Sequence, residues 1–196
     1  MADLYNRIEE IQGMVRVLTG DLSLLEPHLG SRDIQDAVTE NNYAHRRFYV
    51  RAIFALVEAI VEQHRRLLLD LVEQKAVVLK PGVPEVLRER VVFVKEDGSV
   101  AERDQYLQLE RKLRAVYRAA GDAFLQEIAT SFADQGWVSF REAVGIRNRL
   151  THPKSHSDCH VHLHDLVTVE QGQLWFKGLN NEFVRIAHAH RKNHHW

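Results

Sequence analysis

The chain contains a single cysteine, Cys159, among 196 residues, so no disulfide can form within it. We therefore expect a reducing compartment, since disulfides accumulate in oxidising ones. An excess of charge of either sign is also missing, because 26 Lys and Arg residues face 27 Asp and Glu residues. The chain thus has no overall basic field, and an RNA partner would have to bind a local cluster of cations.

Long apolar runs are absent as well. The best candidate for a membrane span, residues 52–61, is interrupted by Glu58. Residues 1–5 have neither the basic flank nor the apolar core of a signal peptide. We therefore expect a cytoplasmic protein without membrane contact. A hydrophobic fraction of 45% over this length suits one globular domain covering residues 1–196.

Apolar residues recur at three- and four-residue steps through most of the chain. This spacing predicts amphipathic helices over 4–25, 32–73 (bent near residues 41–42) and 104–136. Capping-box patterns beginning at Ser139 and Thr168 predict two further helix starts. The expected fold is an all-α, up-and-down bundle of four to five helices. We expect the last residues, 188–196, to form a flexible His-rich tail.

The periodicity changes between residues 76 and 103. Asp97 and Gly98 lie between two stretches rich in β-branched residues, and Asp-Gly in that setting is a strong signal for a tight turn. The sequence therefore predicts a small β-hairpin over residues 90–101, inserted as a loop rather than as a second domain.

A motif of Arg147, Asn148 and His152 precedes Pro153. Proline disfavours helical backbone in the residue before it, so the helix that begins near Phe140 should end at about residue 151. His152 would then lie at a helix C-terminus, where the macrodipole favours its protonated form. On a regular helix Arg147 and His152 point about 140° apart. A site that uses both needs a bent helix end or a second chain.

Arg-Asn-x-x-x-His at the end of a bundle helix resembles the HEPN superfamily of small helical proteins. The resemblance implies a metal-independent endoribonuclease without cofactor, in which Arg147 and His152 are catalytic and Asn148 supports the histidine. It also implies a homodimer of a toxin–antitoxin or antiviral defence system, with an antitoxin or another defence protein as a further partner. Some toxins of this superfamily carry a regulatory tyrosine two residues after the histidine, where this chain has Lys154.

The residue types suit that chemistry. Metal-independent RNA cleavage uses the ribose 2′-hydroxyl as nucleophile, and a histidine can take or give the protons at neutral pH. The planar fork of Arg147 suits the charge that develops on the phosphate. In-line displacement is better served by two such sets, which predicts a two-fold dimer with facing motifs. Nearby cations that could bind the RNA backbone are Arg47, Arg51, Arg149 and Lys154.

Other interpretations of these residues stay open. Arg147 could be a salt-bridging surface residue and His152 a helix cap, in a non-catalytic bundle that binds a protein or nucleic acid. Glu58 could pair with a core arginine or lie half-exposed at the edge of its apolar stripe. The histidine-rich loop could hold Zn²⁺ or be simply polar, and we assign no metal ligand; its members are His156, Cys159, His160, His162 and His164.

Overall fold

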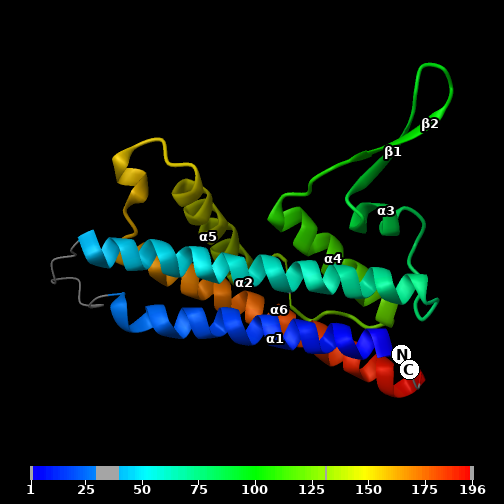
Figure 1. Ribbon diagram of the computed structural model, residues 1–196, viewed down its shortest axis with the longest axis horizontal. Coiled ribbons are helices and arrows are strands. Elements are labelled where there is room, and N and C mark those ends of the chain that lie inside the picture. The colour runs from blue at the N-terminus through cyan, green and yellow to red at the C-terminus, as the bar shows by residue number, and fades with distance from the viewer. Residues whose placement is uncertain (1, 30–39, 131, 195–196) are drawn as a thin grey trace. The chain divides into compact units, whose positions relative to one another are not determined.

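The computed structural model describes residues 2–29, 40–130 and 132–194 of the chain (Figure 1). Within these ranges it forms six α-helices and one antiparallel hairpin, which confirms the all-α fold with a small inserted hairpin. The helices are α1 (Ala2–Leu25), α2 (Glu40–Glu73), α3 (Val83–Leu87), α4 (Leu109–Phe124), α5 (Gln135–Thr151) and α6 (Leu163–His194). The strands are β1 (Arg90–Val94) and β2 (Val100–Asp104).

Five helices are long, as the sequence predicted, and the five-residue α3 was not anticipated. Residues 32–39, the start of the long helix predicted over 32–73, lie outside the described residues. None of the helices in the described ranges is both long and apolar enough to cross a bilayer.

The chain divides into two compact units, each assembled from distant segments. The hairpin unit consists of the described residues of 1–7, 61–130 and 181–196, and the motif unit of those of 8–60 and 131–180. Helices α1, α2 and α6 contribute residues to both units. The division does not test the expectation of one domain over residues 1–196, which stays a prediction.

Aromatic rings from three helices form the centre of the hairpin unit. The His64 imidazole stacks on the Phe183 ring with centroids 3.6 Å apart, and its Nδ1 lies 3.1 Å from the Tyr117 hydroxyl. Phe124 meets Phe183 edge-on. Burial lowers the pKa of His64 to about 3 and raises the pKa of the Tyr117 hydroxyl, so both groups are neutral in the folded protein.

Helix α4 ends earlier than the apolar pattern predicts. Leu125 adopts a left-handed conformation with φ of 52°, and the Gln126 N–H donates to the Gly121 carbonyl at 3.1 Å. This geometry terminates a helix by satisfying one of its last carbonyls. Gly121 suits the position because a Cβ there would lie 3.2 Å from the Gln126 oxygen. The prediction that this helix continues is therefore wrong for residues 125–130 and 132–134, whereas residues 135–136 belong to the next helix, α5.

The motif unit has its own aromatic core between α5 and α6. The ring of Phe140 stacks on Trp137 and contacts Trp175, with centroids 5.8 and 5.3 Å apart. The two helices approach closely at Gly172, where an added Cβ would lie 2.9 Å from the Phe140 Cα atom. A glycine is required there because the neighbouring atoms are backbone.

Both helix starts predicted from capping boxes are wrong. Helix α5 begins at Gln135, because the Asp134 carboxylate accepts the Trp137 N–H at 2.8 Å. Ser139 is a buried residue inside the helix. Helix α6 begins at Leu163 rather than near Thr168, and the Asp165 carboxylate in its first turn accepts the His162 N–H at 2.8 Å.

The C-terminal residues also differ from expectation. Helix α6 continues to His194, so residues 188–194 are helical rather than a flexible tail. His190 is buried in the hairpin unit, where its ring lies 5.2 Å from that of Phe124. Burying this ring against an aromatic neighbour favours helix over an extended, solvated end. Residues 195–196 of the predicted tail lie outside the described residues.

The predicted hairpin is confirmed, and Figure 1 shows it projecting away from α3 and α4. Its turn follows local chemistry: Gly98 has φ of 81°, and its N–H donates to the Lys95 carbonyl at 2.9 Å. The Asp97 carboxylate accepts the Ser99 N–H at 2.9 Å, and the two hydrogen bonds from Ser99 lower the pKa of Asp97. Turn residues of these types make the hairpin a local structure.

Candidate active site

The motif lies at the C-terminal end of α5, as its proline predicts. Thr151 is the last helical residue, and His152 leaves the helix with φ of −129° and ψ of 64°. Its N–H still donates to the Asn148 carbonyl at 3.0 Å, which closes the last turn. The imidazole of His152 is exposed. The structure thus presents a titratable side chain to solvent at the negative end of a helix.

Arg147 is held on two sides. Its Nη2 pairs with the carboxylate of Glu58 on α2, and its Nη1 donates to Oδ1 of Asn148 at 3.0 Å. The Arg147 side chain is 28% exposed and that of Glu58 41%. Asn148 therefore contacts the arginine, whereas sequence reasoning gave it to the histidine. Glu58 thus lies partly exposed at the edge of its stripe, and the arginine that it pairs with is also partly exposed rather than in the core.

Glu58 is the site residue that sequence reasoning did not assign. Its signal was a carboxylate interrupting the apolar stripe of a long helix. Only the fold, however, brings α2 and α5 together and identifies which arginine the carboxylate meets.

Three of the four cations expected to bind RNA donate to main-chain carbonyls. Arg47 Nη1 donates to the Cys159 oxygen at 3.0 Å, and Arg51 Nη2 donates to the Leu150 oxygen at 2.8 Å. Arg149 donates to the carbonyl of His160 at 2.9 Å, and it also forms an ion pair with Asp165 at 3.1 Å. Arg47 thus attaches the segment after α5 to α2, and Arg51 attaches the end of α5 to α2. Arg149 attaches the end of α5 to that segment and to α6. The Lys154 side chain is exposed.

Another arginine of α2, Arg46, is buried in the motif unit. The Arg46 side chain is 2% exposed, its Nε donates to the Leu29 carbonyl at 2.9 Å, and its Nη1 donates to the Val161 carbonyl at 3.2 Å. Arg46 therefore attaches two distant residues to α2: Leu29, which follows the first helical segment, and Val161, which precedes α6. A guanidinium suits this role because it offers several donors in a fixed plane.

The histidine-rich loop is a folded segment. Residues His156–Cys159 form a 3₁₀ turn, and the Asp158 carboxylate accepts the N–H groups of Lys154 and Ser155, which lowers its pKa. The His160 ring stacks on Tyr43 with centroids 4.6 Å apart. Within the described ranges no three His, Cys, Asp or Glu side chains are grouped so that they could hold a metal ion.

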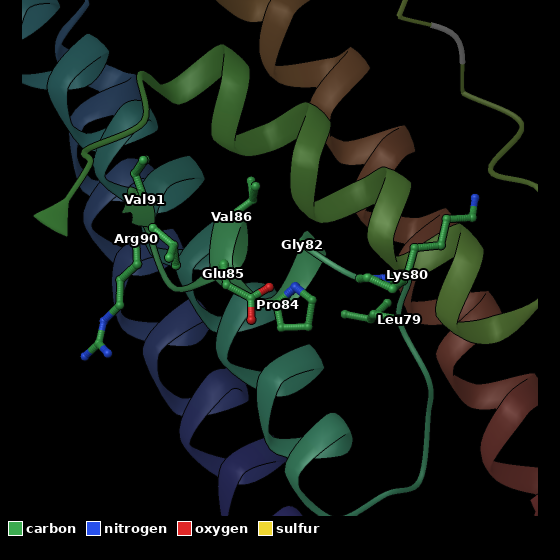
Figure 2. A pocket seen from close by; sticks show the side chains of 10 residues that line it. Leu79, Lys80, Gly82, Pro84, Glu85, Val86, Arg90 and Val91 are labelled. Atoms are coloured by element: carbon green, nitrogen blue, oxygen red, sulfur yellow. The ribbon is translucent and has the colours of Figure 1, made fainter. Parts of the chain in front are cut away.

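A pocket in the hairpin unit is lined by residues of the segment 79–92 and by none of the predicted site residues. It has a volume of about 600 Å³ and is open to solvent. Figure 2 shows its walls, formed by the segment before α3, by α3 itself and by the first residues of β1. Most of the lining is apolar, and the charged side chains around it are Lys80, Glu85 and Arg90.

The chain was compared with protein-family models, curated proteins and solved structures, and none of them matches it.

Proposed function

We propose that this protein is a metal-independent endoribonuclease, the effector of a toxin or antiviral defence system. The observation that carries the proposal is the arrangement of Arg147 and His152 at the end of α5. The guanidinium is restrained by Glu58 and Asn148, and the imidazole lies exposed beyond it. Attack on an RNA phosphodiester can use a restrained guanidinium and an exposed imidazole, and the end of α5 carries both.

In the proposed reaction, one imidazole takes the proton of the ribose 2′-hydroxyl, and the 2′-oxygen attacks phosphorus. The bond from phosphorus to the 5′-oxygen breaks, and a second imidazole protonates that leaving oxygen. The products are a 2′,3′-cyclic phosphate and a free 5′-hydroxyl. Each chain carries one His152, so the second imidazole comes from another copy in a two-fold homodimer.

The arginine and its neighbours have separate roles in this reaction. Arg147 stabilises the charge on the crowded phosphate, and Glu58 is a positioning residue that limits the rotamers of the guanidinium before RNA binds. Asn148, the next residue of α5, also restrains the Arg147 guanidinium by accepting a hydrogen bond from it. The exposed Lys154 attracts the RNA backbone. Arg47 and Arg149 hold the loop that follows His152, and Arg51 holds the end of α5.

A specific observation favours a second candidate function. The carbonyl contacts of Arg47, Arg51 and Arg149 give these residues a structural role, which suits a non-catalytic helical protein that binds a protein or nucleic-acid partner. In that case the pair of Arg147 and Glu58 serves the fold, and His152 is an exposed helix cap. The two candidates differ in whether the motif turns over RNA.

The deciding experiment incubates the full chain with total RNA and tRNA in excess EDTA and identifies the new RNA ends. Variants His152→Ala and Arg147→Ala are tested beside two controls, His188→Ala and Arg141→Ala, which remove exposed side chains outside the motif. The proposal expects 2′,3′-cyclic phosphate ends from the parent and both controls. Loss of at least 100-fold in rate is expected for either motif variant, since each removes a group that acts in the transition state.

Two results would overturn the ribonuclease. One is cleavage that persists in both motif variants, because a contaminating nuclease would then be its source. The other is no cleavage of any RNA by a parent that is folded and dimeric, which would favour the binding module. The Glu58→Gln variant adds a finer test: a positioning role lowers kcat while KM for RNA changes little.

A further inference from the structure

The hairpin leaves an apolar strand edge without a partner. In the described part of the chain its sheet has two strands, β1 and β2, and each strand exposes four of its five residues. The exposed side chains include Val92, Phe93 and Val94 on β1, which are 48%, 39% and 69% exposed. Two strands alone are marginally stable in water, and an apolar edge is a template for another strand.

The hydrogen bonds of the hairpin indicate which backbone groups face outward. The Lys95 N–H donates to the Ser99 carbonyl at 2.8 Å, and the Gln105 N–H donates to the Glu89 carbonyl at 2.7 Å. Bonded and non-bonded pairs alternate along an antiparallel ladder. With the observed register, the outward N–H and C=O groups of β1 are therefore those of Arg90, Val92 and Val94. On β2 they belong to Val100, Glu102 and Asp104.

We propose that β1 pairs with β1 of a second copy of this chain, about a two-fold axis at Phe93, to form a four-stranded antiparallel sheet. In this register Val92 lies opposite Val94 of the second copy, and the two Phe93 rings lie opposite each other. Val92 and Val94 of both copies lie on one face of the sheet, and the two Phe93 rings lie on the other. Cross-strand aromatic and β-branched pairs of this kind stabilise sheets.

Charge selects this edge and this register. Pairing of β2 with itself about its central residue would place two Glu102 carboxylates directly opposite each other, which is destabilising. On β1, an axis at Val92 would place Arg90 opposite an apolar Val94. The axis at Phe93 instead places Arg90 beside the turn of the second copy, which begins at Glu96. Arg90 now pairs with Glu102 at 3.0 Å, but both side chains are more than half exposed, so this contact is readily exchanged.

The pocket shown in Figure 2 supports the same arrangement. Arg90, Val91 and Val92 form part of its wall, so open space borders the first half of β1. The proposed register brings the turn of the second copy, with Glu96 and Asp97, to this end of the strand. Lys80 lines the same pocket, so the acidic turn meets two cations, Lys80 and Arg90, and one carboxylate, Glu85.

A pair of proline variants tests the edge. Val92→Pro and Glu102→Pro each remove an outward N–H, one from each strand, and neither removes a backbone hydrogen bond of the hairpin. Glu102→Pro also removes the exposed ion pair with Arg90. In sedimentation equilibrium of the full chain, we expect Val92→Pro to halve the molar mass of the parent and Glu102→Pro to leave it unchanged. Equal masses for the parent and Val92→Pro would overturn the proposal.

A cross-linking pair tests the register without relying on total mass. In a Cys159→Ser background, Phe93→Cys places two thiols opposite each other at a non-bonded pair, about 4.5 Å apart between Cα atoms and within disulfide range. Val91→Cys is the control, because the register places it opposite Lys95. We expect Phe93→Cys to form a covalent dimer at least ten times faster under mild oxidation. Equal rates, or no dimer from Phe93→Cys, would overturn the register. Neither test involves RNA.

Discussion

Arg147 on α5 and Glu58 on α2 form an ion pair between residues 89 positions apart in the sequence. Both side chains are partly exposed, so solvent screens the pair. A double-mutant cycle with Glu58→Ala and Arg147→Ala should therefore give a coupling below about 1 kcal/mol in urea unfolding. A coupling well above 2 kcal/mol would contradict this and mark the pair as chiefly structural. A small coupling fits a pair whose main effect is on the position of the guanidinium.

The stability of the protein should fall in mild acid because of His64. Its pKa is about 3 in the folded protein and 6.5 in the unfolded chain, so below pH 6.5 the unfolded chain binds one more proton. Above pH 6.5 the imidazole is neutral in both states and the free energy of unfolding keeps its full value. As the pH falls from 6.5 toward 3, the free energy of unfolding decreases progressively. At pH 5 the loss amounts to roughly 2 kcal/mol of unfolding free energy.

The variant that tests this is His64→Phe. The difference in unfolding free energy between parent and variant should shift by roughly 2 kcal/mol in favour of the variant between pH 8 and pH 5. His188→Phe is the control, since His188 is exposed and its replacement should keep the parent's pH dependence. A parent–variant difference that stays constant over this range would contradict the assignment.

Arg46 should be the most costly arginine of α2 to replace. Arg46→Met leaves the carbonyls of Leu29 and Val161 without their buried donor, which should lower the free energy of unfolding by roughly 2–4 kcal/mol. The matched change Arg66→Met removes an exposed pair with Glu62 and should cost less than about 1 kcal/mol. Urea unfolding measures both, and equal losses would show that the carbonyl contacts add little.

Two glycines of α6 should respond in opposite ways to alanine. At Gly172 the added Cβ would lie 2.9 and 3.2 Å from backbone atoms of Phe140, so Gly172→Ala should force α5 and α6 apart and cost roughly 1–3 kcal/mol. Nothing lies within 4 Å of a Cβ added at Gly178, so Gly178→Ala should stabilise the helix by up to about 1 kcal/mol. Thermal unfolding of both variants checks the prediction, and a stabilised Gly172→Ala would refute it.

Local features could be predicted from the sequence because short stretches of chain determine them. Asp97 and Gly98 direct the turn of the hairpin, since glycine adopts positive φ without strain and aspartate bonds the backbone two residues on. Pro153 ends α5 where expected, because it excludes helical backbone at the residue before it. Apolar periodicity likewise identified the long helices.

Contacts between distant segments decided the rest. Ser139 has the pattern of a helix cap but lies buried inside α5, because Asp134 caps the helix earlier and the aromatic core covers its first turns. Pattern alone cannot say that Arg147 meets Glu58, or that the arginines of α2 donate to carbonyls more than 90 residues away. A guanidinium reaches whichever acceptor the packed helices bring near it. The sequence by itself determined that long helices and the hairpin form and where the motif lies. Only the tertiary structure determined several helix ends and the partners of the charged groups.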